Sequence, residues 1–188
     1  MHLAISAMNE LEVAQGVASG ELPSPTEYLN SYYWCIRISG TGCIWRGEPV
    51  NEFAWRDASV WLSDAMVARV AGLPVVAEHP PVGTLNSYEF GMRAIGACLF
   101  GFVRDNELWA IARVLDRHAN ELMLEGLDTS PGVQFAPGDG ARIMVDGKPF
   151  LVEGNPALLD HIAICEKGRW SRDGEPGVEN TEDVEEAA

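Results

Sequence analysis

Three residues of this 188-residue chain stand out as candidates for serine-hydrolase chemistry, which requires a serine and a histidine base. Ser130 lies in the stretch "GLDTSPGVQF", His161 lies within an apolar run, and His79 follows one after a single acidic residue. A serine hydroxyl is a weak nucleophile at neutral pH, so it needs a hydrogen-bonded base, and the base needs a third group that holds its tautomer and stabilises its charge. These residue types allow a nucleophile at Ser130, a base at His79 and an orienting group at His161 or Asp160.

Ser130 also has an ordinary interpretation. Proline and glycine are frequent in turns, and "TSPG" taken alone favours a turn residue over a nucleophile. If Ser130 attacks a carbonyl, the N–H of Gly132, of Val133 or of another loop must stabilise the oxyanion, because Pro131 has no N–H. The backbone around the serine therefore has to decide between the two interpretations.

Two of the four histidines stand out. His2 is terminal, and His118 lies in the polar stretch "LDRHANE", which is typical of an exposed helix start. His79 and His161 each follow an acidic residue directly. A single histidine beside a strand is usually structural, but two of them together with a serine at a strand entrance make catalysis a serious alternative.

Two other chemistries have weaker support. Zinc ligands could come from His79, His118, Asp160 and His161, but no HxH, HxxxH or HExxH spacing occurs, so neither a metal nor a cofactor is expected. Cys165 falls on the same face of a predicted strand as His161, which would suit a cysteine nucleophile. An unpaired cysteine in a strand is more often a core residue.

Charge and composition exclude several classes of function. The net charge is −15, from 28 acidic and 13 basic residues, and such a surface repels nucleic-acid backbones. No apolar run is long enough to span a membrane, and the N-terminal stretch lacks the pattern of a signal peptide. The four cysteines contain no CxxC pair, which favours free thiols in a reducing, cytoplasmic compartment. We therefore expect neither nucleic acid nor a membrane as a partner.

Local patterns predict a β-rich α+β protein. In the first half of the chain, periodicity and turn residues predict a strand, a turn and a strand over 32–47, a helix over 56–74 and a short strand from 75. The second half is predicted to begin with a β-hairpin over 93–115 and a short helix over 116–128. Strands joined by "PGDG" and "DGKP" turns follow, and a last strand lies within 157–170. The expected domains are an N-terminal extension (1–30), one β-rich domain (31–170) and an acidic tail (171–188). The tail has seven acidic residues, one basic residue and almost no apolar ones, so we expect it to be disordered.

Three segments in this order resemble a known family. "LPVVAEHPP", "LDTSPGVQF" and "LLDHIAICEKGRW" are similar to the "HP", "LSxGY/F" and "NHxALxxxGR" blocks of the phage prohead (capsid maturation) proteases. The stretch "IWRGEPVNEFAWRDASVWLSDAMVARVAGLP" is also similar, so the resemblance spans residues 30–170. The chain departs from the family in "TSPG", where many relatives have an apolar residue before the serine, and in "DHIAI", where "NHxAL" is usual.

The resemblance implies a fold, an activity and a set of site residues. The family looks related to the herpesvirus assembly protease, so the implied fold is a β-barrel with surrounding helices. The implied activity is that of a serine endopeptidase without a cofactor. The nucleophile then falls at Ser130, the base at His79 and the third member at His161, for which Asp160 competes. Arg169 matches the "GR" block and is a candidate for contact with the oxyanion or with a carboxylate.

The resemblance also implies partners and a location. The implied partners are the major capsid protein and the scaffold protein. The implied location is the inside of an assembling prohead in the host cytoplasm. A homo-oligomer is one option, because relatives dimerise or act in assemblies. Two alternatives stay open: a non-catalytic assembly protein that keeps the protease fold, and a generic β-rich binding domain. The acidic tail is either a self-cleaved or scaffold-like segment or a plain solubilising tail.

Overall fold

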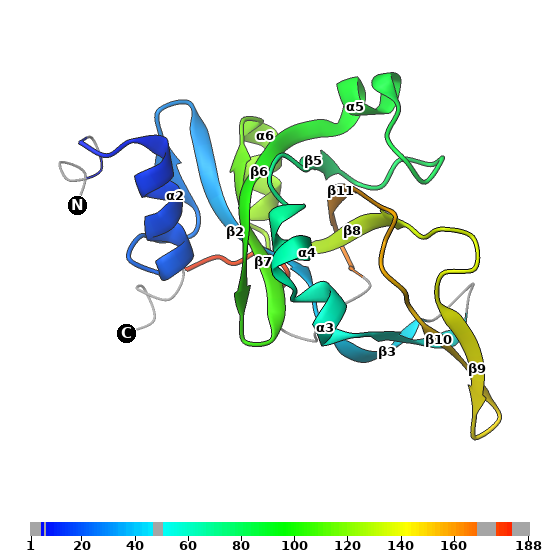
Figure 1. The fold of residues 1–188 in the computed structure, drawn as a ribbon. Helices are drawn as coiled ribbons and strands as arrows, with labels where there is room; N and C mark the ends of the chain where they lie inside the picture. Colours follow the sequence, from blue (N-terminus) through cyan, green and yellow to red (C-terminus); the bar gives the residue numbers. More distant parts are fainter. Residues whose placement is uncertain (1–4, 6, 47–50, 169–175, 182–188) are drawn as a thin grey trace.

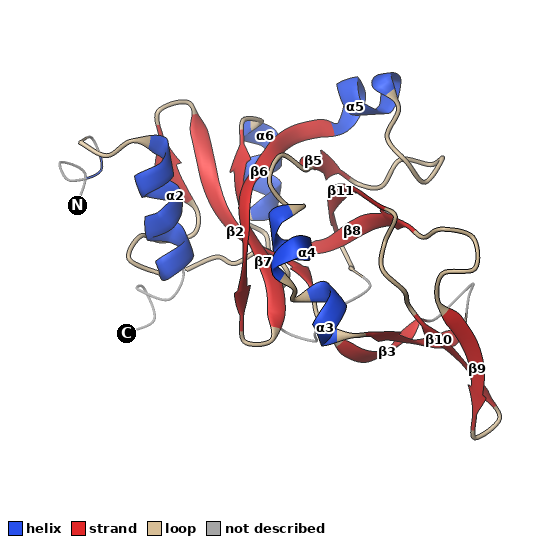
Figure 2. Cartoon of the chain, viewed as in Figure 1, coloured by secondary structure: helices blue, strands red, loops and turns tan. Residues whose placement is uncertain are grey.

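The computed structural model describes residues 5, 7–46, 51–168 and 176–181 and has a β-rich α+β architecture, as predicted (Figures 1 and 2). Its larger sheet contains, in spatial order, β1 (Thr26–Tyr28), β2 (Ser31–Ser39), β7 (Glu107–Val114), β6 (Ala94–Arg104), β5 (Pro74–Ala77), β11 (Leu158–Cys165) and β8 (Asp128–Gln134). Its smaller sheet contains β3 (Gly42–Arg46), β4 (Glu52–Arg56), β10 (Lys148–Val152) and β9 (Ala141–Val145). The helices are α2 (Glu10–Ser19), α3 (Ala58–Trp61), α4 (Asp64–Ala68), α5 (Ser87–Arg93) and α6 (Arg117–Met123).

The two faces of the larger sheet are covered by different helices. Along β2, Trp34 and Ile36 belong to the largest apolar cluster, which also includes residues of α3, α4 and α6. Tyr33 and Cys35 alternate with them and pack in a second cluster with α2. Successive residues of a strand point to opposite faces, so this alternation buries β2 on both sides. The predicted N-terminal extension therefore contains a helix that adds to the core.

The predicted hairpin over 93–115 is confirmed as β6 and β7. Its turn residues, Asp105 and Asn106, have φ values of 53° and 61°. Two-residue turns with positive φ at both positions match the twist of the flanking strands, and Asn and Asp tolerate that conformation. The polar turn in "VRDNEL" was therefore a reliable signal.

The predicted helix over 56–74 is instead two short helices, α3 and α4. Ser63 interrupts the pattern, because its side chain accepts a hydrogen bond from the N–H of Met66 and caps a new helix. Apolar residues of this segment still pack into the core, since Trp61, Met66 and Val70 are buried.

The larger sheet curves but does not close into the barrel that the resemblance implied. Its edge strands are β1 and β8, and no ladder joins β8 to β2 among the described residues. The two strands nevertheless contact each other, and the hydroxyl of Thr129 in β8 donates a hydrogen bond to the carbonyl of Arg37 in β2. The gap between them is bridged by side chains and by a separate segment rather than by strand pairing.

That segment is the C-terminal strap, residues 176–181. Val178 forms an antiparallel bridge with Ile36 of β2, and its N–H donates to the carbonyl of Leu127, 3.2 Å away, just before β8. Val178 is 0% exposed. The predicted disorder of residues 171–188 is therefore wrong for the strap, because a buried valine and backbone hydrogen bonds on both sides hold it between two strands.

We expect Val178→Ala to lower the free energy of unfolding by about 1–3 kcal/mol, because it removes buried apolar atoms and leaves a cavity between β2 and β8. Chemical denaturation followed by tryptophan fluorescence measures the change. Val82→Ala is the matched control, since Val82 is 65% exposed and its truncation should have little effect. Equal effects of the two substitutions would show that the strap does not stabilise the fold.

The smaller sheet is attached to the larger one by a buried arginine. Arg56 contacts Glu153 of the chain after β10 at 2.5 Å (Nε to Oε2) and donates to the Ser39 hydroxyl of β2 at 2.7 Å. Its guanidinium also lies over the ring of Trp61, 3.9 Å from the centroid. These contacts join β4, β2 and α3.

None of the helices in the described ranges has the length and apolar character needed to cross a bilayer.

Candidate functional site

Asp160, His161 and His79 form a continuous line of side-chain contacts, which we call the relay. Nδ1 of His161 lies 2.7 Å from Oδ2 of Asp160, and Nε2 of His161 lies 2.8 Å from Nδ1 of His79. His161 is fully buried, whereas His79 is exposed. The relay therefore runs from the interior of the protein to its surface.

The chemistry of the three groups determines the direction of the hydrogen bonds. An ionised carboxylate only accepts, so the proton on His161 lies on Nδ1 and points to Asp160. The lone pair of His161 Nε2 then accepts from Nδ1–H of His79, which leaves the lone pair of His79 on Nε2. A histidine in this tautomer is prepared to act as a base through Nε2.

A bulge in β11 brings Asp160 and His161 to the same side of the strand. Neighbouring residues of a regular strand point to opposite faces. Here the register against β8 shifts between Leu159 and His161, which makes Asp160 an extra residue. Leu159 before the bulge and Ile162 after it therefore both pack in the apolar cluster, while the two polar side chains lie together on the other face.

Asp160 also holds the loop that carries His79. Its Oδ2 accepts a hydrogen bond from the N–H of Leu85 at 2.8 Å, in the loop between β5 and α5. At the start of this loop, the N–H of Glu78 donates to the carbonyl of Ile164 in β11 at 3.1 Å. The loop is thus tied to β11 on both sides of His79, and one carboxylate orients both histidines.

Gly132 provides the space in which the ring of His161 lies. The two residues face each other across β8 and β11. A Cβ atom at Gly132 would lie 2.2 Å from Cε1 of His161 and 2.6 Å from each ring nitrogen. Only glycine leaves the imidazole this position. Sequence reasoning suggested Gly132 as an oxyanion donor. In the structure, the missing side chain of Gly132 leaves room for the ring of His161, and we call this space the seat of His161.

Ser130 lies within β8, not in a turn. The turn interpretation of "TSPG" was wrong because β8 is the edge of the sheet, where a proline without an N–H is tolerated in a strand. Ser130 faces Ala163 and lies two residues before Gly132, so its side chain points to the same face as His161. β5, β11 and β8 are neighbours in the sheet (Figure 1).

The serine is not hydrogen-bonded to the relay. Ser130 is 4% exposed. In the described part of the chain, no hydrogen bond joins the Ser130 hydroxyl to His79 or His161. Catalytic hydrogen bonds are often long without substrate and shorten in the complex. The structure therefore brings His79, His161, Asp160 and Gly132 together and places Ser130 beside them on the next strand.

The remaining candidates fall outside this arrangement. Arg169 lies outside the described residues. His118 is exposed on α6, near Glu121. Burial, together with the charge of Asp128, raises the pKa of the Cys165 thiol to about 11, so it is a poor nucleophile at neutral pH. No group of three or more metal-ligating side chains gathers within the described ranges.

Sequence reasoning missed one part of the site and left another open. The N–H of Leu85 anchors Asp160, and a backbone group leaves no signal in the residue types. The sequence did not decide between Asp160 and His161 as the partner of His79. The polar pair inside the apolar run "LLDHIAI" was a usable signal, because two adjacent polar residues facing one side require a bulge.

Comparison of the chain with protein-family models, with curated proteins and with solved structures gave no match. The geometry of the site and the three sequence blocks are therefore the observations that bear on its function.

Proposed function

We propose that the protein is a serine endopeptidase of capsid maturation, in which Ser130 is the nucleophile, His79 the base and His161 the third member. The observation that carries the proposal is the 2.8 Å contact between Nδ1 of His79 and Nε2 of His161, beside the strand that bears Ser130. The resemblance of three ordered blocks to the prohead proteases supports the choice of reaction. The curved sheet, in which the strap lies between β2 and the start of β8, is on this proposal a variant of the herpesvirus-protease barrel.

The proposed reaction has two steps. The Ser130 oxygen attacks the peptide carbonyl while His79 Nε2 takes the hydroxyl proton, and the tetrahedral intermediate then loses the amine, which receives that proton. The product is an ester between the acyl group and Ser130. Water attacks this ester, giving one proton to His79, and the serine leaves with that proton as a free hydroxyl. No metal or organic cofactor takes part.

The relay supplies the electrostatic support for this reaction. A neutral histidine stabilises an imidazolium less well than a carboxylate does, so a Ser–His–His set alone predicts a slow enzyme. Here Asp160 lies 2.7 Å behind His161 and polarises it toward His79. The negative charge is one ring away from the base, which strengthens the base without placing a carboxylate in direct contact with it.

We expect Asp160→Asn to lower kcat by about 10- to 1,000-fold with a small change in KM, because an amide can neither supply the charge nor select the tautomer of His161. The pH profile of kcat should change as well, which a purely structural role would not cause. Kinetics on a peptide spanning a cleaved junction measure both effects. Asp64→Asn, at an exposed carboxylate in the first turn of α4, is the matched control and should leave the kinetics unchanged.

The proposed substrates are extensions of the major capsid protein and of the scaffold protein, cleaved inside the assembling prohead in the host cytoplasm. The decisive experiment compares the wild-type protein and Ser130→Ala when each is produced with these two proteins.

A second candidate is a non-catalytic assembly protein with the same fold. The observation that favours it is the missing hydrogen bond between the buried Ser130 and the relay in the described part of the chain. Such a protein would bind scaffold or capsid protein and leave both uncut. The same experiment separates the two functions.

A further inference from the structure

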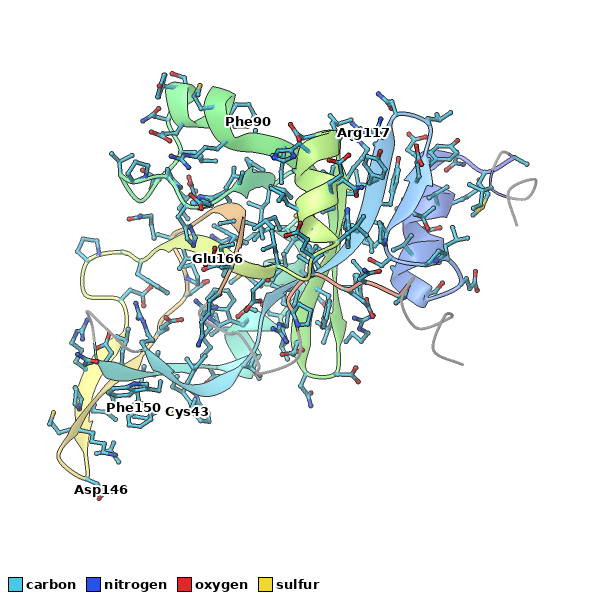
Figure 3. All side chains as sticks on the ribbon, turned by 180° about the vertical axis from the view of Figure 1, so that it is seen from behind. Cys43, Phe90, Arg117, Asp146, Phe150 and Glu166 are labelled. Carbon is cyan, nitrogen blue, oxygen red and sulfur yellow. The ribbon has the colours of Figure 1, made fainter. Side chains whose placement is uncertain are left out.

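A cavity of about 580 Å³ lies between α5, α6 and the carboxyl ends of β5 and β11. Figure 3 shows α5 and α6 on two sides of this region, with Glu166 at the end of β11. The floor is apolar and is formed by Ile95, Met123, Leu127 and Ile164. Its size is in the range of cavities that bind ligands, and apolar surface of this kind gains free energy when a ligand covers it.

The rim of the cavity is acidic. Glu78, Glu125 and Glu166 line it and are exposed. Among the described residues of the lining, the basic one is Arg93, which is paired with Glu89 at 2.5 Å (Nε to Oε2). A cationic ligand therefore meets three carboxylates, whereas an anionic ligand would be repelled.

Apolar surface continues around the cavity on its two bordering helices. Met92 of α5 is 68% exposed and Leu122 of α6 is 39% exposed, and both border the cavity. A small cation would leave these two side chains exposed to water, whereas a peptide segment would cover them as well. The surface therefore fits an extended or helical segment that alternates apolar and basic residues.

This site is separate from the relay. Ile164 lines the cavity, whereas His161 and Ala163 point to the opposite face of β11. Glu78 lies on the cavity side and its neighbour His79 belongs to the relay. A ligand can thus occupy the cavity without covering Ser130.

We propose that this cavity is a docking site for a basic amphipathic peptide segment of a protein partner. An apolar side chain of the segment enters the cavity, and its Lys or Arg side chains lie on the three rim glutamates. The inference goes beyond the proposed function, because docking here requires no cleavage.

The test measures the Kd of a short, fluorescently labelled amphipathic peptide of leucine and lysine by anisotropy. The protein carries Ser130→Ala throughout, so that the result is independent of any peptidase activity. The test variant is the double substitution Glu125→Gln and Glu166→Gln. The control variant is Glu27→Gln and Glu121→Gln, which removes the same charge from exposed positions outside the cavity lining.

We expect the test variant to raise the Kd about 3- to 30-fold and the control variant to leave it within about twofold. A peptide with serine in place of leucine should bind far more weakly to every variant. Equal weakening by the two variants would overturn the proposal, because it would show general attraction to an acidic protein. Equal binding of the serine peptide, or no binding of the leucine–lysine peptide, would also overturn it.

Discussion

Wild-type protein produced together with its capsid and scaffold proteins is expected to yield shortened forms of one or both, and the Ser130→Ala variant is expected to leave both at full length. The substitution removes the only atom of Ser130 that can form the acyl-enzyme. Loss of a serine nucleophile typically lowers turnover by about 10⁴-fold or more, so no product should be visible. Electrophoresis and intact-mass measurement of the two partner proteins give the result.

The variant should fold as the wild type does. The hydroxyl of Ser130 forms no hydrogen bond with the relay in the described part of the chain, so its removal leaves neither histidine without its partner. Ser87→Ala is the control, because Ser87 is an exposed serine at the start of α5 and its loss should not affect cleavage. Identical band patterns for wild type and Ser130→Ala would remove Ser130 as nucleophile and favour the assembly protein.

Gly132→Ala is expected to abolish most of the cleavage, although it replaces none of the side chains of Ser130, His79 and His161. The new methyl group would lie 2.2 Å from Cε1 of His161, so the ring has to move away from His79. A displacement of about 1 Å in a catalytic group costs roughly 100-fold in rate, and overpacking of this kind also costs about 1–3 kcal/mol of stability. Cleavage rate and chemical denaturation measure the two effects.

Gly91→Ala is the matched control for this experiment. Gly91 lies within α5, and a Cβ atom there meets nothing within 4 Å. Alanine in a helix is more favourable than glycine by about 0.5–1 kcal/mol, so this variant should be at least as stable as the wild type and fully active. Normal cleavage by Gly132→Ala would show that cleavage does not depend on the position of the His161 ring. It would contradict the proposal that the contact between His161 and His79 supports catalysis.

Sequence patterns predicted those parts of the fold that depend on neighbouring residues. The hairpin of β6 and β7 followed from "VRDNEL" because a turn with positive φ at two positions depends on the turn residues themselves. The helix over 56–74 failed at Ser63 because a capping side chain competes with the helical pattern at that position. The strap was missed because its burial depends on a gap between β2 and β8, which are far from it in the sequence.

The sequence by itself determined the candidate residues, because nucleophile, base and acid chemistry belongs to side-chain types that can be counted in a chain with four histidines. It also determined the β-rich class, because strand periodicity and turns are local. Only the tertiary structure decided that His161 contacts His79 and that Asp160 lies behind it. That order depends on a one-residue bulge against β8 and on the missing side chain of Gly132. Strand register and the space around a ring arise from contacts between distant segments, so no local pattern encodes them.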